Sequence, residues 1–344
     1  MKTSIVPMST VPQELVEDYL TKPGIGRGFS PDELRWKYYD SEFNNGRERG
    51  FAWLKQGRVQ GFIGVIPVTV ATGDAGDRDL VWTCDWAVED PANSPGIGIL
   101  LLSKVHKNYD FVGGVGGTEY TRSIVPRMRT RTIPDAAVAL RRPLRLKPLL
   151  ERIERAASFA PKLSRTRLGQ LTLPLRKTAD PEVPVTMSTG VSAPVAALFD
   201  RPEAGVAVVR YDARHLAWIG RCPSLDVRSC HVGSGSAAAG ALLWRRHDNP
   251  DKWRLSVRST AEGKHLLEPL LADILARLRN QEAATVLATV VSGNDVPTLE
   301  LLKRGGFITG EAHDLYITLL EGPGACEQGF AEMSYLDTDL GLVP

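Results

Sequence analysis

The sequence predicts an α/β protein, of the α+β type, built from two lobes that repeat one order of elements. Three observations support this fold class. The chain has 344 residues, which exceeds one typical hydrophobic core. Both halves combine runs of alternating apolar residues with segments of helical periodicity. Within the first half, a strand runs through a glycine loop into an apolar helix between Trp86 and Leu102.

The first half opens with a β-hairpin, because two apolar-rich runs at 51–56 and 59–70 are joined by Gln56-Gly57-Arg58. The elements expected after it are a strand at 80–88, a helix whose apolar face holds Ile97, Leu100, Leu101 and Val105, a short strand at 111–116, a helix that Thr118 caps, and a strand at 133–140.

The second half repeats this order. Strands at 241–246 and 253–257 flank a turn-rich loop. The elements expected after it are a helix with Leu266, Leu267, Leu270, Leu271, Ile274 and Leu278 on one face, a β-branched strand at 284–291, a helix at 294–304 that ends at Gly305-Gly306, and closing strands at 307–319. Each half therefore predicts hairpin, strand, helix, strand, helix and strand.

The expected domains are a first lobe at 1–145, a basic helical linker at 146–184 and a second lobe at 185–344. The segment at 141–182 is rich in Arg, Lys, Leu and Pro, and it contains an expected helix at 147–160. It is either a solvated connector with a cationic face or a positive rim that attracts a phosphate-bearing substrate.

Composition indicates an ordinary globular protein, with 43% hydrophobic and 24% charged residues and a net charge of +2. No run approaches the roughly 18 apolar residues that span a bilayer, and the first residues contain no apolar core of signal-peptide length. The four cysteines form no CxxC pair, and the six histidines show no metal-ligand spacing. We therefore expect a reduced, cytoplasmic protein with no metal and no membrane partner.

The loop with Gly96 and Gly98 places backbone N–H groups at a helix N-terminus, where they can bind an anion. Two glycines one residue apart also let the backbone approach a phosphate closely. The alternative interpretation is a tight strand-to-helix turn without a ligand.

This order of elements resembles the GNAT acyltransferase superfamily in a tandem form. Residues 88–98 are similar to its acyl-CoA loop pattern, Arg/Gln-x-x-Gly-x-Gly/Ala, although Asn93 stands at the Arg/Gln position. Residues 294–307 are similar to a later helix of the family that ends in a Gly-Phe pair. The segment at 261–265, where the second lobe would carry its own glycine loop, does not match.

The resemblance implies two tandem GNAT-like lobes, each a mixed, mostly antiparallel sheet flanked by helices. It places the co-substrate, acetyl-CoA or a short-chain acyl-CoA, in the first lobe and makes the second lobe a degenerate partner. The strand before the glycine loop is expected to splay open at Ala87 and Val88, whose N–H groups would polarise the thioester carbonyl. The residues expected to hold the pyrophosphate are Asn93, Ser94, Pro95, Gly96, Ile97, Gly98 and Ile99.

Transfer to an amine also benefits from a base and an acid. Asp85 and Glu119 are the candidate bases, and Tyr120 is the candidate acid that reprotonates the thiolate. Asp85 could instead be a buried, hydrogen-bonded carboxylate, and Glu119 a first-turn residue that favours the helix dipole.

A closer resemblance is to bacterial N-acyltransferases that act on nucleotide-linked amino sugars, in surface polysaccharide biosynthesis. It rests on residues 36–39, 215–223 and 333–339. The residues that could stack on a sugar or base, or pack in the core, are Trp36, Tyr38, Tyr39, Trp82, Trp86 and Trp218. Asp337 could bond sugar hydroxyls or lie in an exposed tail.

Three alternatives stay open. The first is a Fem-like transferase that takes its acyl group from aminoacyl-tRNA, although no aromatic residues are interleaved with the basic run. The second is a non-catalytic module that binds CoA or a nucleotide. The third is acetylation of protein lysines or N-termini. A homodimer is also left open, and a nucleic-acid partner is not favoured.

Overall fold

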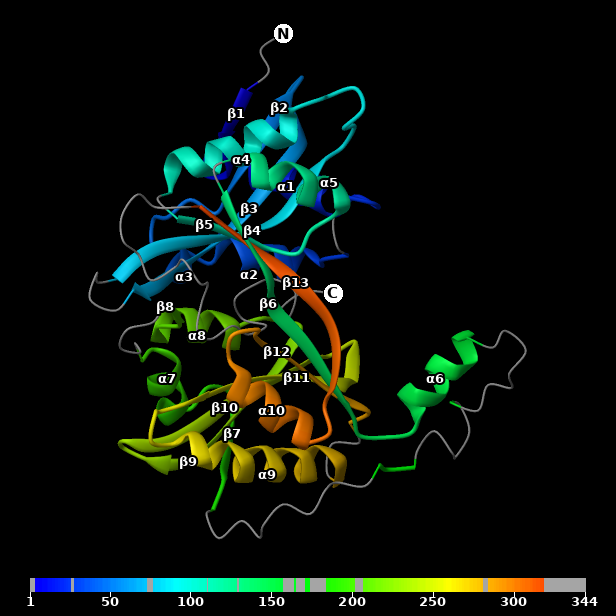
Figure 1. Ribbon diagram of the computed structural model, residues 1–344. Coiled ribbons are helices and arrows are strands. Elements are labelled where there is room, and N and C mark those ends of the chain that lie inside the picture. Colours follow the sequence, from blue (N-terminus) through cyan, green and yellow to red (C-terminus); the bar gives the residue numbers. More distant parts are fainter. Residues whose placement is uncertain are drawn as a thin grey trace. The chain divides into compact units, whose positions relative to one another are not determined.

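The computed structural model describes residues 4–25, 28–72, 77–109, 111–128, 130–156, 164, 171–173, 184–201, 207–280 and 284–318 (Figure 1). The chain forms two compact units. Unit 1 comprises Met1–Ala137, Pro202–Pro223 and His313–Pro344, and unit 2 comprises Val138–Arg201 and Ser224–Ala312. Both units mix helices with a mostly antiparallel sheet, which is the predicted fold class.

Unit 1 holds a sheet with helices on both faces. Its elements are β1 (Ser4–Pro7), η1 (Met8–Thr10), α1 (Gln13–Leu20), α2 (Pro31–Tyr39), α3 (Ser41–Asn44), β2 (Gly50–Lys55), β3 (Arg58–Thr72), β4 (Asp77–Val88), α4 (Ile97–Asn108), β5 (Phe111–Val115), α5 (Glu119–Ile124), η3 (Val125–Arg127), β8 (Ala207–Arg210) and α8 (Ala213–Gly220). The strands follow the order β1-β2-β3-β4-β5-β13, in which β13 is Ile308–Thr318, and β8 pairs with the C-terminal end of β3.

Two apolar clusters cover the two faces of this sheet. Because successive residues of a strand point to opposite faces, Phe62 packs with the residues of α1 and α2, whereas Ile63 packs with those of α4. The first cluster includes Tyr38 from α2, and the second includes Leu101 from α4. The face of α2 and the face of α4 are therefore distinct surroundings for β4.

The predicted hairpin in the first half is confirmed. Strands β2 and β3 are antiparallel, and Gln56 and Gly57 connect them with φ angles of 57° and 75°. Two successive left-handed residues are what a type I′ turn requires, and this turn matches the twist of the strands.

Unit 2 repeats the mixed design. Its elements are α6 (Lys147–Ala156), β7 (Thr186–Thr189), α7 (Ala193–Phe199), β9 (Leu225–Ser234), β10 (Ala237–Arg246), β11 (Asn249–Ser259), η6 (Lys264–Leu266), α9 (Leu267–Asn280), β12 (Val286–Ser292) and α10 (Val296–Arg304). The strand order is β6-β12-β11-β10-β9-β7. Strands β6 (Thr130–Pro143) and β13 (Ile308–Thr318) contribute residues to both units.

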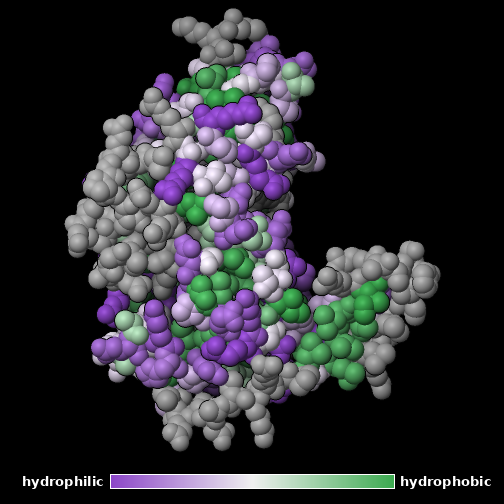
Figure 2. Space-filling view, in the orientation of Figure 1, coloured by the Kyte–Doolittle hydropathy of each residue, from purple (hydrophilic) through white to green (hydrophobic). Residues whose placement is uncertain are grey.

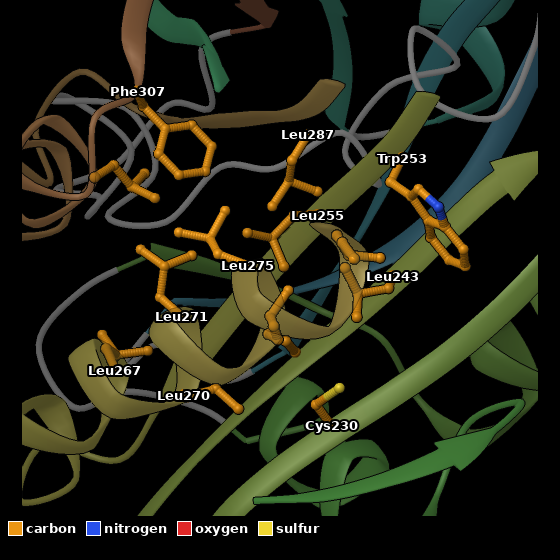
Figure 3. Packing of buried hydrophobic residues seen from close by; sticks show 14 of the residues in the cluster. Cys230, Leu243, Trp253, Leu255, Leu267, Leu270, Leu271, Leu275, Leu287 and Phe307 are labelled. Atoms are coloured by element: carbon orange, nitrogen blue, oxygen red, sulfur yellow. The ribbon is translucent and has the colours of Figure 1, made fainter. Parts of the chain in front are cut away.

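The periodic leucines of the second half form the core of unit 2. Helix α9 buries six of its residues, among them Leu270 and Leu271. Figure 3 shows the leucines of α9 beside Leu255 and Leu287 of the sheet, with Phe307 near them. The hairpin of β10 and β11 is confirmed, with a turn shorter than the expected loop at 247–251.

The contiguous lobes expected at 1–145 and 185–344 differ from the units that the contacts define. Residues 202–223 follow the linker in sequence, yet they belong to unit 1. There β8 extends the sheet beside β3, and Trp218 of α8 stacks on Trp36 at a centroid distance of 4.5 Å. Aromatic burial across 182 residues of sequence decides this membership.

Helix α6 lies in the expected basic linker at 146–184, of which residues 146–156, 164, 171–173 and 184 are described. It has a strongly amphipathic pattern, and Figure 2 shows an apolar patch in its region, where Ile153 is 58% exposed and Leu171 is 55% exposed. No helix in the described ranges is long and apolar enough to cross a membrane.

Candidate active site

A cavity of about 170 Å³ lies in unit 1, between the ends of β4 and β5 and next to α4. Its walls come from residues 83–86 of β4, residues 112–115 of β5, Leu102 and His106 of α4, the start of α5 and Tyr316 of β13. We call this region the unit 1 fork.

The fork exists because two parallel strands separate. Strands β4 and β5 pair from Leu80–Phe111 to Trp82–Gly113, and no later pair forms although both strands continue. The sequence predicted that β4 would splay at Ala87 and Val88. The pairing with β5 ends earlier, directly after Trp82, so Ala87 and Val88 lie beyond it, where they pair with Phe62 and Gly61 of β3.

Glycines keep the fork open. A Cβ atom at Gly113 would lie 2.6 Å from the Trp82 ring, and one at Gly114 would lie 2.8 Å from Thr83 Oγ1. Gly116 and Gly117 follow with φ angles of 70° and 106°, which L side chains rarely adopt. The run Gly113-Gly-Val-Gly-Gly117 therefore forms a wall of bare backbone.

On the other wall, β4 contains a β-bulge. Phe62 pairs with Ala87 and Gly64 pairs with Cys84, so Ile63 faces both Asp85 and Trp86. Asp85 has a φ angle of 46°, in the left-handed region. A bulge takes its extra residue out of the ladder. Asp85 and Trp86 thus share one neighbour on β3 and lie beyond the last pair of β4 with β5.

The carboxylate of Asp85 is held in the interior. Lys37 Nζ lies 2.6 Å from Asp85 Oδ2, and the two side chains are 2% and 4% exposed. The Tyr38 hydroxyl donates a hydrogen bond to the same oxygen. Burial is the main cause that raises the pKa of Tyr38, and the negative charge of Asp85 adds to it. These contacts match the alternative that Asp85 is a buried, hydrogen-bonded carboxylate.

The predicted anion loop precedes α4. Gly96 is the N-cap of α4 with a φ angle of 82°, and the N–H groups of Gly98 and Ile99 lie in the first turn, where a helix provides no acceptor. Trp86 connects this turn to the fork, because it lines the cavity and its Nε1 would lie 3.3 Å from a Cβ atom at Gly98. Ser94, Pro95 and Ile97 complete the loop, and Ile97 N–H donates to Ser94 O.

Asn93 is already engaged within the loop. Its side-chain amide donates to Asp90 Oδ2 at 2.8 Å, and its backbone N–H donates to Asp90 Oδ1 at 3.2 Å. These bonds are the main cause that lowers the pKa of Asp90. Glu89 forms an ion pair with Lys22 at 2.9 Å. Asn93 would have to release Asp90 before it could bind a phosphate, so its predicted role is unsupported here.

His106 lines the cavity, although it was not among the site residues expected from the sequence. Thr318 Oγ1 donates to Val112 O at 3.2 Å and lies 3.1 Å from His106 Nδ1. Both bonds form only if Nδ1 carries the proton, which leaves Nε2 as an acceptor. Nε2 is buried without a hydrogen-bond partner among the residues that the structure describes. Burial lowers the pKa of His106, so its imidazole is neutral at pH 7. The sequence pattern that could have indicated His106 is a polar residue four positions after Leu102, on the apolar face of the helix.

The second missed residue is Tyr316. It is buried on β13, opposite Gly114 of β5, and it lines the cavity. Burial is the main cause that raises the pKa of Tyr316, and Asp314 adds to it. The phenol therefore stays protonated at neutral pH and can donate a proton. Its place depends on the pairing of β13 with β5, which the sequence does not reveal.

Most of the predicted stacking residues lie in the core. Trp218 lies between Trp36 and Phe43, with centroid distances of 4.5 Å and 4.3 Å and interplanar angles of 9°. Trp36 and Trp218 each donate an indole N–H to the other's backbone carbonyl. Both faces of Trp218 are covered, so the structure offers packing in place of the predicted sugar stacking.

The other predicted site residues fall in three places. Tyr38 and Trp82 are fully buried, and Tyr39 packs against the same cluster as Tyr38. Glu119 is exposed as the first residue of α5, and it is absent from the walls of the cavity. Asp337 and the side chain of Tyr120 lie outside what the structure describes.

The described residues contain no group of three side chains that could hold a metal ion. No protein-family model matches the sequence, and no curated protein matches it.

Solved structures match over most of the chain. A GCN5-related N-acetyltransferase from Anabaena variabilis is 9% identical with a TM-score of 0.56, and the match covers 92% of this chain and 72% of that one. Saccharomyces cerevisiae N-myristoyltransferase with bound myristoyl-CoA is 14% identical with a TM-score of 0.55, covering 92% and 82%. A tandem GNAT protein from the clavulanic acid biosynthesis pathway is 14% identical with a TM-score of 0.50, covering 94% and 99%. At these identities the likeness concerns the fold, and the fold of this chain is that of the GNAT acyltransferases, a tandem member among them.

Proposed function

We propose that this protein is an acyl-CoA-dependent N-acyltransferase that binds its donor in unit 1. One observation carries the proposal. The unit 1 fork combines a cavity, a glycine wall and a bulged strand beside a helix that begins at a glycine cap. Two of the structural neighbours support the donor class, an N-myristoyltransferase with bound myristoyl-CoA and a GCN5-related N-acetyltransferase.

The donor supplies a thioester whose carbonyl carbon an amine attacks. In the fork, backbone N–H groups at the bulge of Asp85 and Trp86 would stabilise the oxyanion, as pre-aimed donors do. The C–N bond forms as the C–S bond breaks, the amine loses a proton to a base, and the thiolate takes one from an acid. Tyr316 is our candidate acid, because it lines the cavity with a protonated phenol. Glu119 keeps the role of candidate base only through its place between Thr118 and Thr121, which both line the cavity.

The pyrophosphate would lie at the start of α4. The residues from Glu89 to Gly96 include no Lys or Arg, so the N–H groups of Gly98 and Ile99 and the helix dipole would supply the attraction. Glu89 and Asp90 oppose it. We therefore expect donor affinity to depend more on the fork than on the loop.

We propose a small amine as the acceptor, and specifically the amine of an amino sugar, nucleotide-linked and used in surface polysaccharide biosynthesis. What supports it is the sequence resemblance alone, since Trp36 and Trp218 pack in the core and residues 333–339 lie outside the described ranges. A panel of free and nucleotide-linked amino sugars, lysine peptides and aminoglycosides tests this choice.

Calorimetric titration of CoA and acetyl-CoA tests the donor. The parent should bind both, and Gly98→Glu should lose binding, because its carboxylate would stand where the pyrophosphate is expected. Lys264→Glu is the matched control, since it adds a carboxylate at the corresponding turn of unit 2, and it should bind like the parent. If the parent binds neither molecule, the CoA proposal fails and the aminoacyl-tRNA alternative comes first. Binding without turnover over the panel would favour a non-catalytic module.

A further inference from the structure

The buried ion pair below the bulge has a layout that the acyl-transfer chemistry does not require. Two consecutive residues of one helix, Lys37 and Tyr38 of α2, reach the same oxygen of Asp85, which lies 47 residues further along the chain than Tyr38. A base that accepts protons from an amine would be expected to face the cavity. Asp85 lines the cavity, yet its carboxylate oxygen Oδ2 is bound by two residues of α2, a helix whose residues are absent from the cavity walls.

Gly64 of β3 leaves room for the Tyr38 side chain to reach Asp85. A Cβ atom at Gly64 would lie 2.2 Å from the Tyr38 hydroxyl, so only glycine at this position of β3 lets the phenol reach the bulge on β4. The Tyr38 hydroxyl also lies 3.6 Å from Cys84 Sγ. Lys37 Nζ lies 4.8 Å from the centroid of the Phe29 ring, which adds a cation–π contact.

Helix α2 is fixed firmly enough to hold the bulge. Its N-terminus carries a complete capping box, in which Ser30 N–H donates to Glu33 Oε2 at 2.8 Å and Glu33 N–H donates to Ser30 Oγ at 3.2 Å. Tyr38 packs edge-on against Phe62 with a centroid distance of 5.3 Å. Phe62 is the last β3 residue paired before the bulge.

From this geometry we propose that Lys37 and Tyr38 are positioning residues that act through Asp85. They hold its carboxylate on the α2 face and so fix the left-handed backbone of Asp85. That backbone in turn sets the direction of the N–H groups at the bulge on the cavity side. The inference rests on the proposed function, and it assigns Asp85 to orienting the oxyanion site in place of accepting the proton of the amine.

The left-handed conformation makes the proposal testable, because glycine adopts it freely whereas alanine does not. Removing Asp85 alone would leave the buried cation of Lys37 without this carboxylate, which could unfold the protein. We therefore compare Lys37→Met/Asp85→Gly with Lys37→Met/Asp85→Ala. Both double variants lack the carboxylate and the cation, and they differ only by one methyl group at the bulge.

The readout is the infrared band of acetyl-CoA labelled with ¹³C at the thioester carbonyl, since polarisation by the N–H groups moves this band to lower frequency. Calorimetry establishes separately that each variant binds the donor. We expect a shift in the parent, most of it in the glycine variant, and none in the alanine variant. In Tyr38→Phe, which keeps the ring and loses the hydroxyl, the band should broaden or shift less.

Three results would overturn the inference. One is a bound donor whose band does not shift in the parent, and another is an equal shift in the glycine and alanine variants. The third is loss of the shift in both variants while circular dichroism shows a folded protein, because the carboxylate itself would then act on the donor. Absence of donor binding to the parent would instead refute the proposed function, so the two failures are distinguishable.

Discussion

The two units contain the same kind of parallel strand pair, whose pairing ends before the strands do, and they fill the space beyond the last pair differently. In unit 1, β4 and β5 part after Trp82–Gly113, and the space between them is the cavity. In unit 2, β11 and β12 pair from Lys252–Val286 to Leu255–Thr289. The residues that follow this last pair, Ser256 and 290–292, are buried, and Val291 belongs to the apolar core.

Three local differences explain this contrast. Counted from the last pair of each unit, Gly113 and Gly114 of β5 stand where β12 carries Thr289 and Val290. Strand β4 has a bulge at the fork, whereas β11 pairs with β10 in regular register from Trp253 to Ser259. The connection to the helix is eight residues long in unit 1, from Glu89 to Gly96, and only 260–263 in unit 2.

The short connection of unit 2 also uses its own hydrogen-bond donors. Gly263 N–H donates to Thr260 Oγ1 at 2.9 Å, and Ala238 N–H donates to the same oxygen at 3.0 Å. A Cβ atom at Gly263 would lie 2.2 Å from Ala238 O, so the loop is packed against β10. Glycine thus allows close packing in both units, and in unit 1 the glycines from Gly113 to Gly117 also line the cavity.

The largest expected effect comes from giving β5, in the unit 1 fork, a valine of the kind that β12 carries in unit 2. Gly114→Val places a branched side chain against Thr83 and into the cavity. We expect donor affinity to fall by roughly 10³-fold or more, equivalent to about 4 kcal/mol. Calorimetry with acetyl-CoA measures it, and circular dichroism checks the fold.

Two controls belong to this experiment. Gly114→Ala combined with Thr83→Ala removes the nearest clash and should recover part of the binding. Val291→Ala opens the buried pair of unit 2, and it should cost about 1 kcal/mol of unfolding free energy while donor binding is unchanged. Unaltered binding in Gly114→Val would show that the fork is not the donor site.

The strand next to β5 in unit 1 and the strand next to β12 in unit 2 also differ, and this difference predicts a smaller effect, on kcat. Next to β5, β13 brings Tyr316 to the cavity, whereas next to β12 the residues of β6 at 138–143 contain no tyrosine. Tyr316→Phe should lower kcat by about 10²-fold, since general acid catalysis contributes roughly that factor or more. Donor affinity should stay unchanged. Steady-state kinetics with the best amine of the panel measures kcat, and an unaltered kcat would remove Tyr316 from the mechanism.

The smallest effect concerns acid stability, in which unit 1 should be the weaker unit. Burial lowers the pKa of His215 from 6.5 to about 3 in its cluster with Phe43, Tyr211 and Trp218. Asp212 opposes this shift, while Arg47 and Arg49 add to it. At a pH below the pKa that His215 has in the unfolded chain, the unfolded chain binds a proton that the folded chain does not bind. Unfolding free energy should therefore fall by about 1.4 kcal/mol per pH unit as the pH drops.

Hydrogen exchange between about pH 7 and about pH 5 can resolve this difference by peptide. Peptides from the core of unit 1 should lose protection before those from α9 and β12. His215→Leu removes the titrating group and should abolish the extra loss. Equal losses in parent and variant would show that His215 does not control the acid response.

The sequence was most informative where the structure follows local rules. The Gln56-Gly57 turn, the leucine face of α9 and the glycine start of α4 were all expected from spacing and turn chemistry, and all are observed. The sequence at 261–265 does not match a glycine loop, and the structure has a short connection there that forms its own hydrogen bond between Gly263 and Thr260. These features need only residues within a few positions of one another.

Long-range contacts decided the rest. Trp36 and Trp218 became core residues because their faces and indole N–H groups meet each other across the chain. The carboxylate of Asp85 contacts two polar groups in the interior, because α2 brings Lys37 and Tyr38 to it. Tyr316 entered the site through the pairing of β13 with β5.

The sequence by itself therefore indicated the hairpin of β2 and β3, the buried face of α9 and the glycine start of α4, whereas α1, α2, α8 and β9 were not expected. Only the tertiary structure decided that residues 202–223 join unit 1, where the strands of each unit part, and which polar groups face a cavity. The physical reason is that periodicity encodes which face of an element leaves water. The partner that covers this face, and the polar atoms that must then be satisfied, depend on which distant segments come together.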